Sequence, residues 1–328
     1  MLNLGFFNHT LCYRGTSKAI YNYMAAILMA KENTCLYYIF LKQEKGNRLG
    51  FALHLLELGV NILPVENYEE LINISSMFNF LYHVTSADKS GLDWFKRIRS
   101  ESTLIHQVGY QQPEYSLSRH FAYTSYWQSF FFTNGSASVL PYIISSPRLG
   151  LQDHTKLRSV LGIPESALVL GRHGGSDTWN LPFASEAVER AVSQRSDLWF
   201  IYVGTPKFSS HERIIFLDSI SSLHKLEYFF NACDAMIHAR WEGETFGMAC
   251  AEFLIRGKPI ITWSESREQN HLFLAGRSVI TYNTGEDLYT TLITINKNYI
   301  FHKSSLINHS QFEMYSPAQI SNQISSLF

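Results

Sequence analysis

The chain has 328 residues, of which 46% are hydrophobic and 17% are charged, and its formal net charge is −1. This length and apolar content suit two domains of roughly 150 residues, each large enough to bury a core. The near-neutral charge argues against a nucleic-acid-binding protein, which would show a strong basic excess. The four cysteines lie far apart and form no CxxC pair, which favours buried free thiols over a metal site or a disulfide framework.

The beginning of the sequence indicates a strand rather than a secretory leader, because the segment after Met1 lacks a basic region and a cleavage site. No run of about 18 apolar residues occurs, so we expect a cytoplasmic protein without a spanning helix. The run Trp94–Arg99 is basic and aromatic, which is compatible with peripheral contact with an anionic bilayer. A solvated helix face is the alternative, and the shortness of the run favours it.

Apolar segments of strand length alternate with helical segments through the first half of the chain. The expected strands are Leu2–Phe7, Cys35–Leu41, Val60–Val65, Phe78–Val84 and Ser102–Val108, and the expected helices are Ser17–Lys31 and Phe51–Leu58. This alternation predicts a parallel sheet covered by helices. A further extended segment, 138–142, is expected to close this first domain.

Two residues in the first half are candidates for a site. Gly15 lies between the first strand and the first helix, where Thr16 or Ser17 can cap the helix while its N–H groups face a ligand. His106 ends the strand Ser102–Val108 and precedes a polar stretch. A single glycine is more often only a turn residue, and a lone histidine at a strand end is more often structural, so both candidates need further support.

The second half begins another series of alternating elements. Strands are expected at 167–171, 198–204 and 214–217, followed by a helix at 226–234 and a strand at 235–239. The first of these strands ends in Arg172, whose two-pronged guanidinium can hold phosphate oxygens.

The segment after residue 239 is the most informative part of the sequence. Residues 240–244 are polar and contain a glycine, which indicates a loop, and Phe246–Arg256 is long enough for a helix. Gly257 fits the position just past the helix end, and Pro259 begins the next strand, 259–263. This order predicts a helix that starts at the carboxyl end of a parallel strand.

Such a helix start is a natural anion site. Free N–H groups from Thr245 to Met248 would point outward at the positive end of the helix dipole, and Gly247 removes a side chain where a ligand comes close. Glu252 would share a helix face with Thr245, about 10 Å further along the axis. A carboxylate there can accept hydrogen bonds from sugar hydroxyls. Glu244 at the loop end would lie nearer the reacting group.

The motif resembles that of the retaining GT-B nucleotide-sugar glycosyltransferases, in particular glycosyltransferase family 4. That pattern is Glu-x-Phe-Gly-x-x-x-x-Glu, followed by Gly-x-Pro and a strand. It is matched by Glu244, Phe246, Gly247, Glu252, Gly257 and Pro259. The resemblance spans most of residues 160–265 and is looser over 1–145.

The resemblance implies an α/β GT-B fold with two Rossmann-like domains that face each other across a cleft. The N-terminal domain, 1–145, would be the acceptor side, and the C-terminal domain, 146–312, would be the nucleotide-sugar donor side. The segment 313–328 would form a C-terminal helix that crosses back onto the first domain.

The resemblance also implies transfer of a hexose from a UDP- or GDP-linked sugar to a glycan or lipid-linked acceptor, with retention at the sugar carbon. Glu244 and His106 would be catalytic. No cofactor is expected, and because the sequence has no Asp-x-Asp motif, we expect a reaction without a metal. The donor-binding residues it implies are Arg172, Gly15, Thr245, Phe246, Gly247, Met248 and Glu252.

One position departs from the family pattern. The family has a lysine about six residues after the Gly-Arg pair, and this chain has Thr178 there. The Arg/Lys pair stabilises the charge that builds on the leaving diphosphate. Arg240, Lys207 or the loop N–H groups of Gly174 and Gly175 would have to take over this role, or activity would be reduced.

Two other functions stay open. An epimerase or hydrolase on the same scaffold would act on a nucleotide sugar without an acceptor, whereas a phosphorylase would need a pyridoxal-phosphate lysine that the sequence does not indicate. A nucleotide-sugar-binding protein without catalysis is the second alternative, because of the missing lysine. The sugar, the base and the acceptor depend on loops such as 107–120 and 264–272, whose shape the sequence leaves open.

Overall fold

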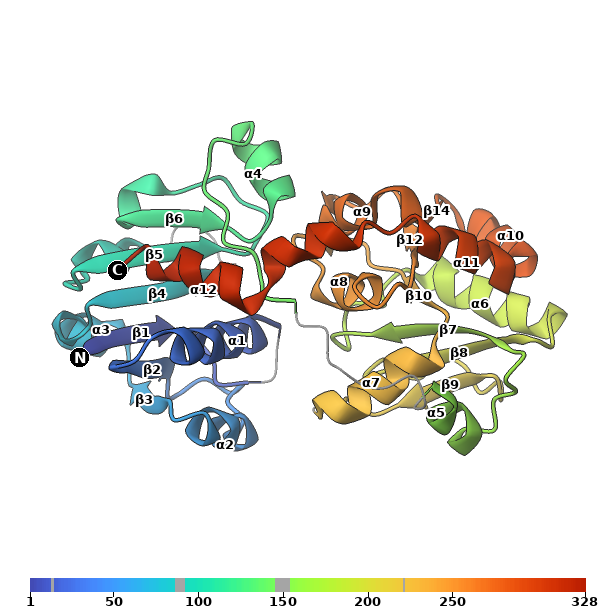
Figure 1. The fold of residues 1–328 in the computed structure, drawn as a ribbon, viewed down its shortest axis with the longest axis horizontal. Coiled ribbons are helices and arrows are strands. Elements are labelled where there is room, and N and C mark those ends of the chain that lie inside the picture. Colours follow the sequence, from blue (N-terminus) through green and yellow to red (C-terminus); the bar gives the residue numbers. More distant parts are fainter. Residues whose placement is uncertain (13–14, 86–91, 145–153, 221) are drawn as a thin grey trace. The chain divides into compact units, whose positions relative to one another are not determined.

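A computed structural model describes residues 1–12, 15–85, 92–144, 154–220 and 222–328. The chain divides into two compact units: unit 1 contains Met1–Ile143 and Glu313–Phe328, and unit 2 contains Ile144–Phe312. The domain boundary expected between 145 and 146 lies outside the described residues. Each unit has a parallel six-stranded sheet covered by helices, which confirms the predicted α/β fold class (Figure 1).

The sheet of unit 1 has the strand order β3-β2-β1-β4-β5-β6. Its strands are β1 (Leu2–Phe7), β2 (Thr34–Leu41), β3 (Asn61–Val65), β4 (Phe80–Thr85), β5 (Ser102–Gln107) and β6 (His120–Tyr123). The predicted strand at 138–142 is wrong, since only Val139 forms an isolated bridge, to Tyr123. Pro141 explains this, because proline has no N–H to donate to a strand ladder.

Five helices belong to the described part of unit 1. They are α1 (Gly15–Ala30), α2 (Leu49–Glu57), α3 (Tyr68–Ile74), α4 (Tyr126–Thr133) and α12 (Pro317–Ser325). The last helix, α12, packs along α1, as Figure 1 shows, and it buries Ile320 and Ile324. Ser316 caps its first turn and Pro317 occupies its start, where a missing N–H costs nothing. Short 3₁₀ turns lie at Ser75–Met77, Asp93–Arg97 and Tyr115–Leu117.

The main sheet of unit 2 has the order β14-β12-β10-β7-β8-β9. Its strands are β7 (Leu168–His173), β8 (Leu198–Val203), β9 (Ile214–Leu217), β10 (Ala235–His238), β12 (Ile260–Trp263) and β14 (Ile280–Tyr282). A separate two-stranded parallel sheet joins β11 (Gly243–Glu244) to β13 (Glu268–Gln269). This small sheet carries the first glutamate of the predicted motif.

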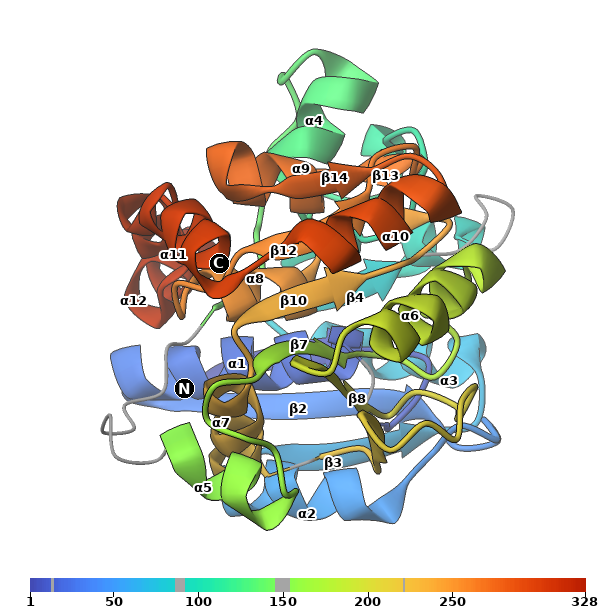
Figure 2. The same ribbon diagram turned by 90° about the vertical axis from the view of Figure 1, so that its right-hand side faces the viewer.

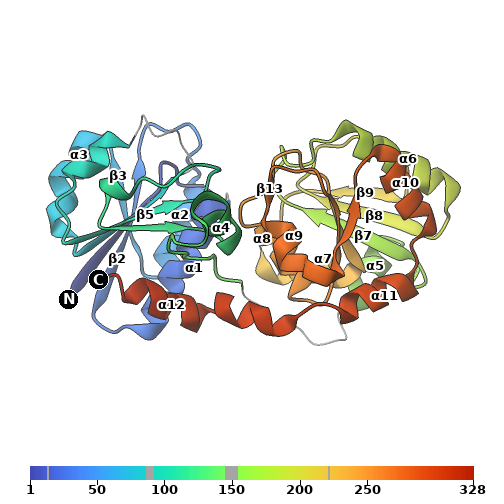
Figure 3. The same ribbon diagram turned by 90° about the horizontal axis from the view of Figure 1, so that it is seen from above.

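Helices cover both faces of the main sheet of unit 2. Figures 2 and 3 show α6 and α10 on one face, where they enclose a continuous apolar core, and α7 and α8 on the other. The helices of this unit are α5 (His154–Val160), α6 (Pro182–Gln194), α7 (Leu223–Ala232), α8 (Met248–Leu254), α9 (Asn270–Ala275), α10 (Gly285–Thr294) and α11 (Lys297–Ser305). Further 3₁₀ turns lie at Gly276–Ser278 in unit 2 and at His309–Tyr315 where the chain passes back to unit 1.

Candidate functional site

Neighbouring parallel strands of unit 2 end at a common edge of the sheet. There β7 ends in Arg172 and His173, β10 ends in His238, and β12 ends in Trp263. The predicted motif follows β10 directly. Since parallel sheets bind ligands beyond the carboxyl ends of their strands, this edge is the candidate site of unit 2.

Arg172 is buried at the end of β7, with 2% of its surface exposed. Its guanidinium donates to the carbonyl of Gly175 at 2.8 Å and to the hydroxyls of Thr205 and Thr178. Burial lowers the pKa of Arg172 to about 10, so the group remains a cation at neutral pH. Thr178, at the position of the family's lysine, therefore holds this cation in place and adds no second charge.

Glu244 lies between two basic side chains. Its Oε1 is 3.3 Å from Nε2 of His238, and its Oε2 is 3.1 Å from a guanidinium nitrogen of Arg240. Burial by itself would raise the pKa of Glu244, but the hydrogen bond from His238 and the charge of Arg240 outweigh it and lower the pKa to about 2. The carboxylate is therefore ionised and fixed at both oxygens.

His238 is itself held from two sides. The hydroxyl of Thr262 lies 2.8 Å from Nδ1 of His238, so a proton on Nε2 can be donated to Glu244 while Nδ1 accepts from Thr262. Tyr282 donates to the backbone carbonyl of His238 at 2.9 Å. The ring of His271 lies 4.9 Å away, and burial lowers the pKa of His271 to about 3, which keeps it neutral. His238 thus aims one nitrogen at Glu244.

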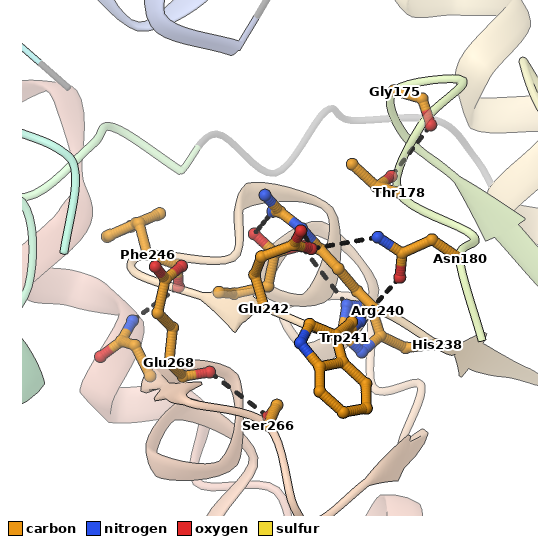
Figure 4. Close-up of polar contacts among 12 residues, drawn as sticks. Gly175, Thr178, Asn180, His238, Arg240, Trp241, Glu242, Phe246, Ser266 and Glu268 are labelled. Carbon is orange, nitrogen blue, oxygen red and sulfur yellow. Dashed lines mark hydrogen bonds and ion pairs between the residues drawn. The ribbon is translucent and has the colours of Figure 1, made fainter. Parts of the chain in front are cut away.

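The loop from Arg240 to Glu242 is fixed by a residue that precedes α6. Asn180 donates from Nδ2 to Glu242 at 3.1 Å and accepts at Oδ1 from the backbone N–H of Trp241 at 2.7 Å (Figure 4). Its own N–H donates to the carbonyl of Ala239 at 3.1 Å. Arg240 also approaches Glu242, at 3.4 Å. One amide side chain therefore sets the course of the whole loop.

The start of α8 differs from the prediction. The helix begins at Met248 rather than at Phe246, because Gly247 adopts a left-handed conformation with φ of 84° and serves as the N-cap. The left-handed backbone favours glycine here, and a Cβ at Gly247 would also lie a tight 3.2 Å from the Cβ of Glu244. Thr245 precedes the helix and so does not share a helix face with Glu252, and that expectation was wrong. Phe246 is buried, and its carbonyl accepts from Asn270 at 2.6 Å.

Glu252 lies on α8 and is nearly buried, with 8% of its surface exposed. Its Oε2 is 3.0 Å from Nε2 of His173 at the end of β7. The ring of His173 packs on Phe230 and Phe253. The contact between Glu252 and His173 connects α8 to the sheet edge, and a role of Glu252 at ribose hydroxyls stays a prediction.

Gly15 lies in unit 1, where it is the exposed first residue of α1, and residues 13–14 before it lie outside the described part. A Cβ at Gly15 would meet nothing within 4 Å, so space does not demand a glycine there. Ser17, in the same turn, accepts from Asn8 at 2.9 Å and from Tyr38 at 3.2 Å. These bonds tie the start of α1 to β2 and to the residue that follows β1. Contact of this turn with a donor stays a prediction.

His106 is fully buried in β5 of unit 1, with no exposed surface. Its Nδ1 lies 2.6 Å from the hydroxyl of Tyr82, and the rings of Tyr23 and Tyr142 pack around it. Burial lowers the pKa of His106 to about 3, so the imidazole is neutral. In this position His106 supports the sheet and offers no surface to a ligand; the predicted catalytic role stays untested and has no support here.

The basic and aromatic run 94–99 is held within unit 1. Trp94 stacks on Tyr68 with 4.6 Å between ring centroids, Lys96 pairs with Asp93 at 3.0 Å, and Arg97 donates to Glu69 at 2.6 Å. These contacts neutralise two of its charges. In the described part of the chain no helix is long and apolar enough to cross a membrane, and no cluster of three or more metal-binding side chains occurs.

Several residues that shape the site escaped the sequence analysis. His238 was included only in an apolar strand, although a histidine that ends a buried strand directly before the motif is a usable signal. Asn180, Trp241 and Glu242 carry no recognisable spacing, because their contacts join segments about 60 residues apart in the sequence. His271 comes close to His238 only through the fold.

No protein-family model matches the chain, and no curated protein sequence matches it. Solved structures do. HepE from Anabaena, in complex with UDP and glucose, aligns with a TM-score of 0.73 and 14% identity over 99% of both chains. A glycosyltransferase from Rickettsia africae aligns with a TM-score of 0.70 and 12% identity, covering 99% of this chain and 97% of that one. The chain therefore has the GT-B fold.

The same fold also carries a different activity class among these structures. A putative UDP-N-acetylglucosamine 2-epimerase from Listeria monocytogenes aligns with a TM-score of 0.60 and 11% identity, covering 99% of this chain and 94% of that one. At such identities the likeness fixes the fold, and the reaction has to be argued from the site.

Proposed function

We propose that the chain transfers a hexose from a nucleotide-diphosphate sugar to a glycan or lipid-linked acceptor, with retention of configuration and without a metal. Unit 2 would be the donor side and unit 1 the acceptor side. The observation that carries this proposal is Glu244, an ionised carboxylate fixed by His238 and Arg240 at the edge of the sheet.

The donor diphosphate would lie at Arg172 and at the start of α8. Arg172 supplies a buried, permanently charged guanidinium. The first N–H groups of α8 have no acceptor within the helix, and no side chain caps them at Gly247. The HepE structure is a complex with UDP and glucose, which supports UDP as the first nucleotide to test and GDP as the second. These groups would oppose the diphosphate charge in place of a metal.

Glu244 would act on the sugar ring. A carboxylate that is already ionised and already oriented can stabilise positive charge at the sugar carbon without reorganising during the reaction. Arg240 keeps this carboxylate in place, and because it also contacts Glu242, it serves both acids. Arg240 is therefore a weaker replacement for the family's lysine than a free cation would be.

Thermal-shift measurements with UDP, GDP and their glucose and mannose conjugates test donor binding. We expect one nucleotide to raise the melting temperature, since a ligand of the native state stabilises it by mass action. Arg172→Gln should lower the affinity for that nucleotide at least about tenfold, as expected for a lost charge-assisted contact. Glu286→Gln is the matched control. Glu286 lies exposed on α10, where it pairs with Arg190, and its substitution should leave nucleotide binding unchanged. No shift with any nucleotide would overturn the proposal.

The alternatives differ in product. An epimerase, favoured by the likeness to the Listeria protein, would release free or inverted sugar from the nucleotide sugar without any acceptor. A binding protein, favoured by Thr178 in the place of a lysine, would bind the nucleotide tightly and turn nothing over. NMR of the sugar product separates these outcomes from transfer to an added acceptor.

A further inference from the structure

Trp241 is exposed at the edge of the candidate site. Trp241 lies in the loop between β10 and Glu244, and 62% of its surface is exposed to solvent. Single exposed apolar residues are common on protein surfaces and need no explanation. Trp241 differs from them because its position is fixed on several sides.

One face of the indole is backed by a second tryptophan. The rings of Trp241 and Trp263 lie 5.2 Å apart at an interplanar angle of 27°, in a stacked arrangement. Trp263 is itself 8% exposed, donates from Nε1 to the carbonyl of Asn283 at 3.0 Å, and packs against Phe183. With one face against Trp263 and most of the residue exposed, the opposite face of Trp241 is open.

The backbone of Trp241 is fixed as well. Its N–H donates to Asn180 at 2.7 Å, and the same Asn180 donates to the neighbouring Glu242 at 3.1 Å. A rigid aromatic face loses little conformational entropy when a ligand packs on it. The carboxylate of Glu242, the next residue in the chain, is partly exposed, so it can accept further hydrogen bonds from hydroxyl groups.

The acids near Trp241 outnumber the cation there, because the single guanidinium of Arg240 pairs with both Glu242 and Glu244. This excess of negative charge disfavours a phosphate group, and Figure 4 shows the indole pointing away from Thr178 and Gly175, which contact Arg172, the proposed phosphate ligand. An electron-rich aromatic face attracts the weakly positive C–H groups of a sugar ring, and a carboxylate within reach of that ring can accept hydrogen bonds from its hydroxyls.

We propose that Trp241, backed by Trp263 and followed in the chain by the partly exposed Glu242, is a stacking platform for an uncharged sugar ring of the acceptor, three residues before Glu244. This inference rests on the proposed function, since it assigns the acceptor's chemistry at the same site. It predicts that the ring touching unit 2 carries no phosphate or carboxylate.

Saturation-transfer NMR with a panel of methyl glycosides of hexoses and N-acetylhexosamines tests the platform without requiring turnover. We expect magnetic saturation to pass from the wild-type protein to the ring protons of at least one glycoside, with UDP present or absent. Trp241→Ala should lower the affinity for that glycoside about tenfold, which is the scale of a lost aromatic contact. Trp241→Phe should keep part of this affinity. Phe301→Ala, a similarly exposed aromatic residue on α11, is the control and should bind as the wild type does.

The UDP thermal shift of the same variants separates the two proposals. Loss of the UDP shift in the wild type would remove the donor function and leave the sugar result standing. The proposal would be overturned if Trp241→Ala bound the glycoside as well as the wild type does. It would also be overturned if the wild type passed no saturation to any glycoside of the panel. Weakened UDP binding by Trp241→Ala with unchanged glycoside binding would assign Trp241 to the nucleotide base and would overturn it too.

Discussion

The charge state of Glu244 follows from its immediate neighbours. A carboxyl with only 20% of its side chain exposed would ordinarily be harder to ionise, yet His238 and Arg240 lower its pKa to about 2. His238 depends in turn on Thr262 and on the neutral ring of His271. His238 and Arg240 directly precede the motif, whereas Thr262 and His271 come from β12 and α9, so the ionised form of Glu244 depends on both the local sequence and the fold.

This arrangement predicts a pH-dependent contribution to stability. A carboxyl whose pKa is lower in the folded state stabilises the fold above its unfolded pKa, about 4.3, and the gain disappears as the pH falls toward the folded value. Glu244→Gln should therefore lower the free energy of unfolding by on the order of 2 kcal/mol near pH 7, with a smaller difference at each step below about pH 4. Urea unfolding at a series of pH values measures it. A difference that stays constant from pH 7 to pH 3 would show that Glu244 is not held ionised by its neighbours.

At the residue scale, the sequence identified Glu244 and Glu252 as candidate site residues but did not identify the side chains that hold them. Glu244, Gly247 and Arg172 belong to a spacing pattern within one or two segments, and a pattern of that kind can be recognised without a structure. Asn180 and His271 act through contacts across the fold. The burial of His106 among tyrosines was equally hidden, because each of those tyrosines lies in a different element.

The strand β7 positions the site through a close contact with α7. Gly171 precedes Arg172, and a Cβ there would lie 2.2 Å from the sulfur of Cys233, just after α7. A side chain at this position fits only if the side chains of Cys233 and Phe229, or the backbone, move. Glycine at this position lets β7 lie close to α7 and so fixes where the guanidinium of Arg172 projects.

Gly171→Ala should therefore destabilise the protein by about 1–3 kcal/mol, the usual cost of overpacking a core. Adding Cys233→Ala removes the sulfur and should restore more than half of the loss, because contacting residues are non-additive. Gly15→Ala is the matched control, since a Cβ there meets nothing within 4 Å. Thermal unfolding of the wild type, both single variants, the double variant and the Gly15→Ala control measures the effects. Full additivity of the two substitutions would contradict the proposed contact.

Elements with strong periodicity were predictable and weakly marked ones were not. Strands such as β1 and β7 are continuous apolar runs of strand length, which periodicity identifies. The helices α3 and α4 went unpredicted, although Asn67 and Ser125 cap their first turns. The start of α8 was misplaced because an N-cap glycine with positive φ cannot be distinguished in sequence from one inside a helix.

On the scale of the whole molecule, unit 1 is built from both ends of the chain. The segment Glu313–Phe328 returns to it after unit 2 is complete. Ser321 donates to the carbonyl of Ala26 at 3.2 Å, and Ser102 donates to the carbonyl of Leu327 at 2.6 Å, so helix α12 is bonded to α1 and its following residues to β5. Unit 2 holds the residues of the motif within one continuous segment, which explains why a sequence pattern could identify this unit first.

The most direct test of the central claim is turnover of labelled UDP- and GDP-sugars by the wild type and by Glu244→Gln. We expect slow hydrolysis or transfer by the wild type, and a loss of at least about 100-fold in Glu244→Gln, the scale for removing one preorganised electrostatic group. Nucleotide-induced thermal stabilisation should persist in the variant and show that it is folded and binds the donor. Normal turnover by a folded Glu244→Gln protein would contradict the role proposed for Glu244.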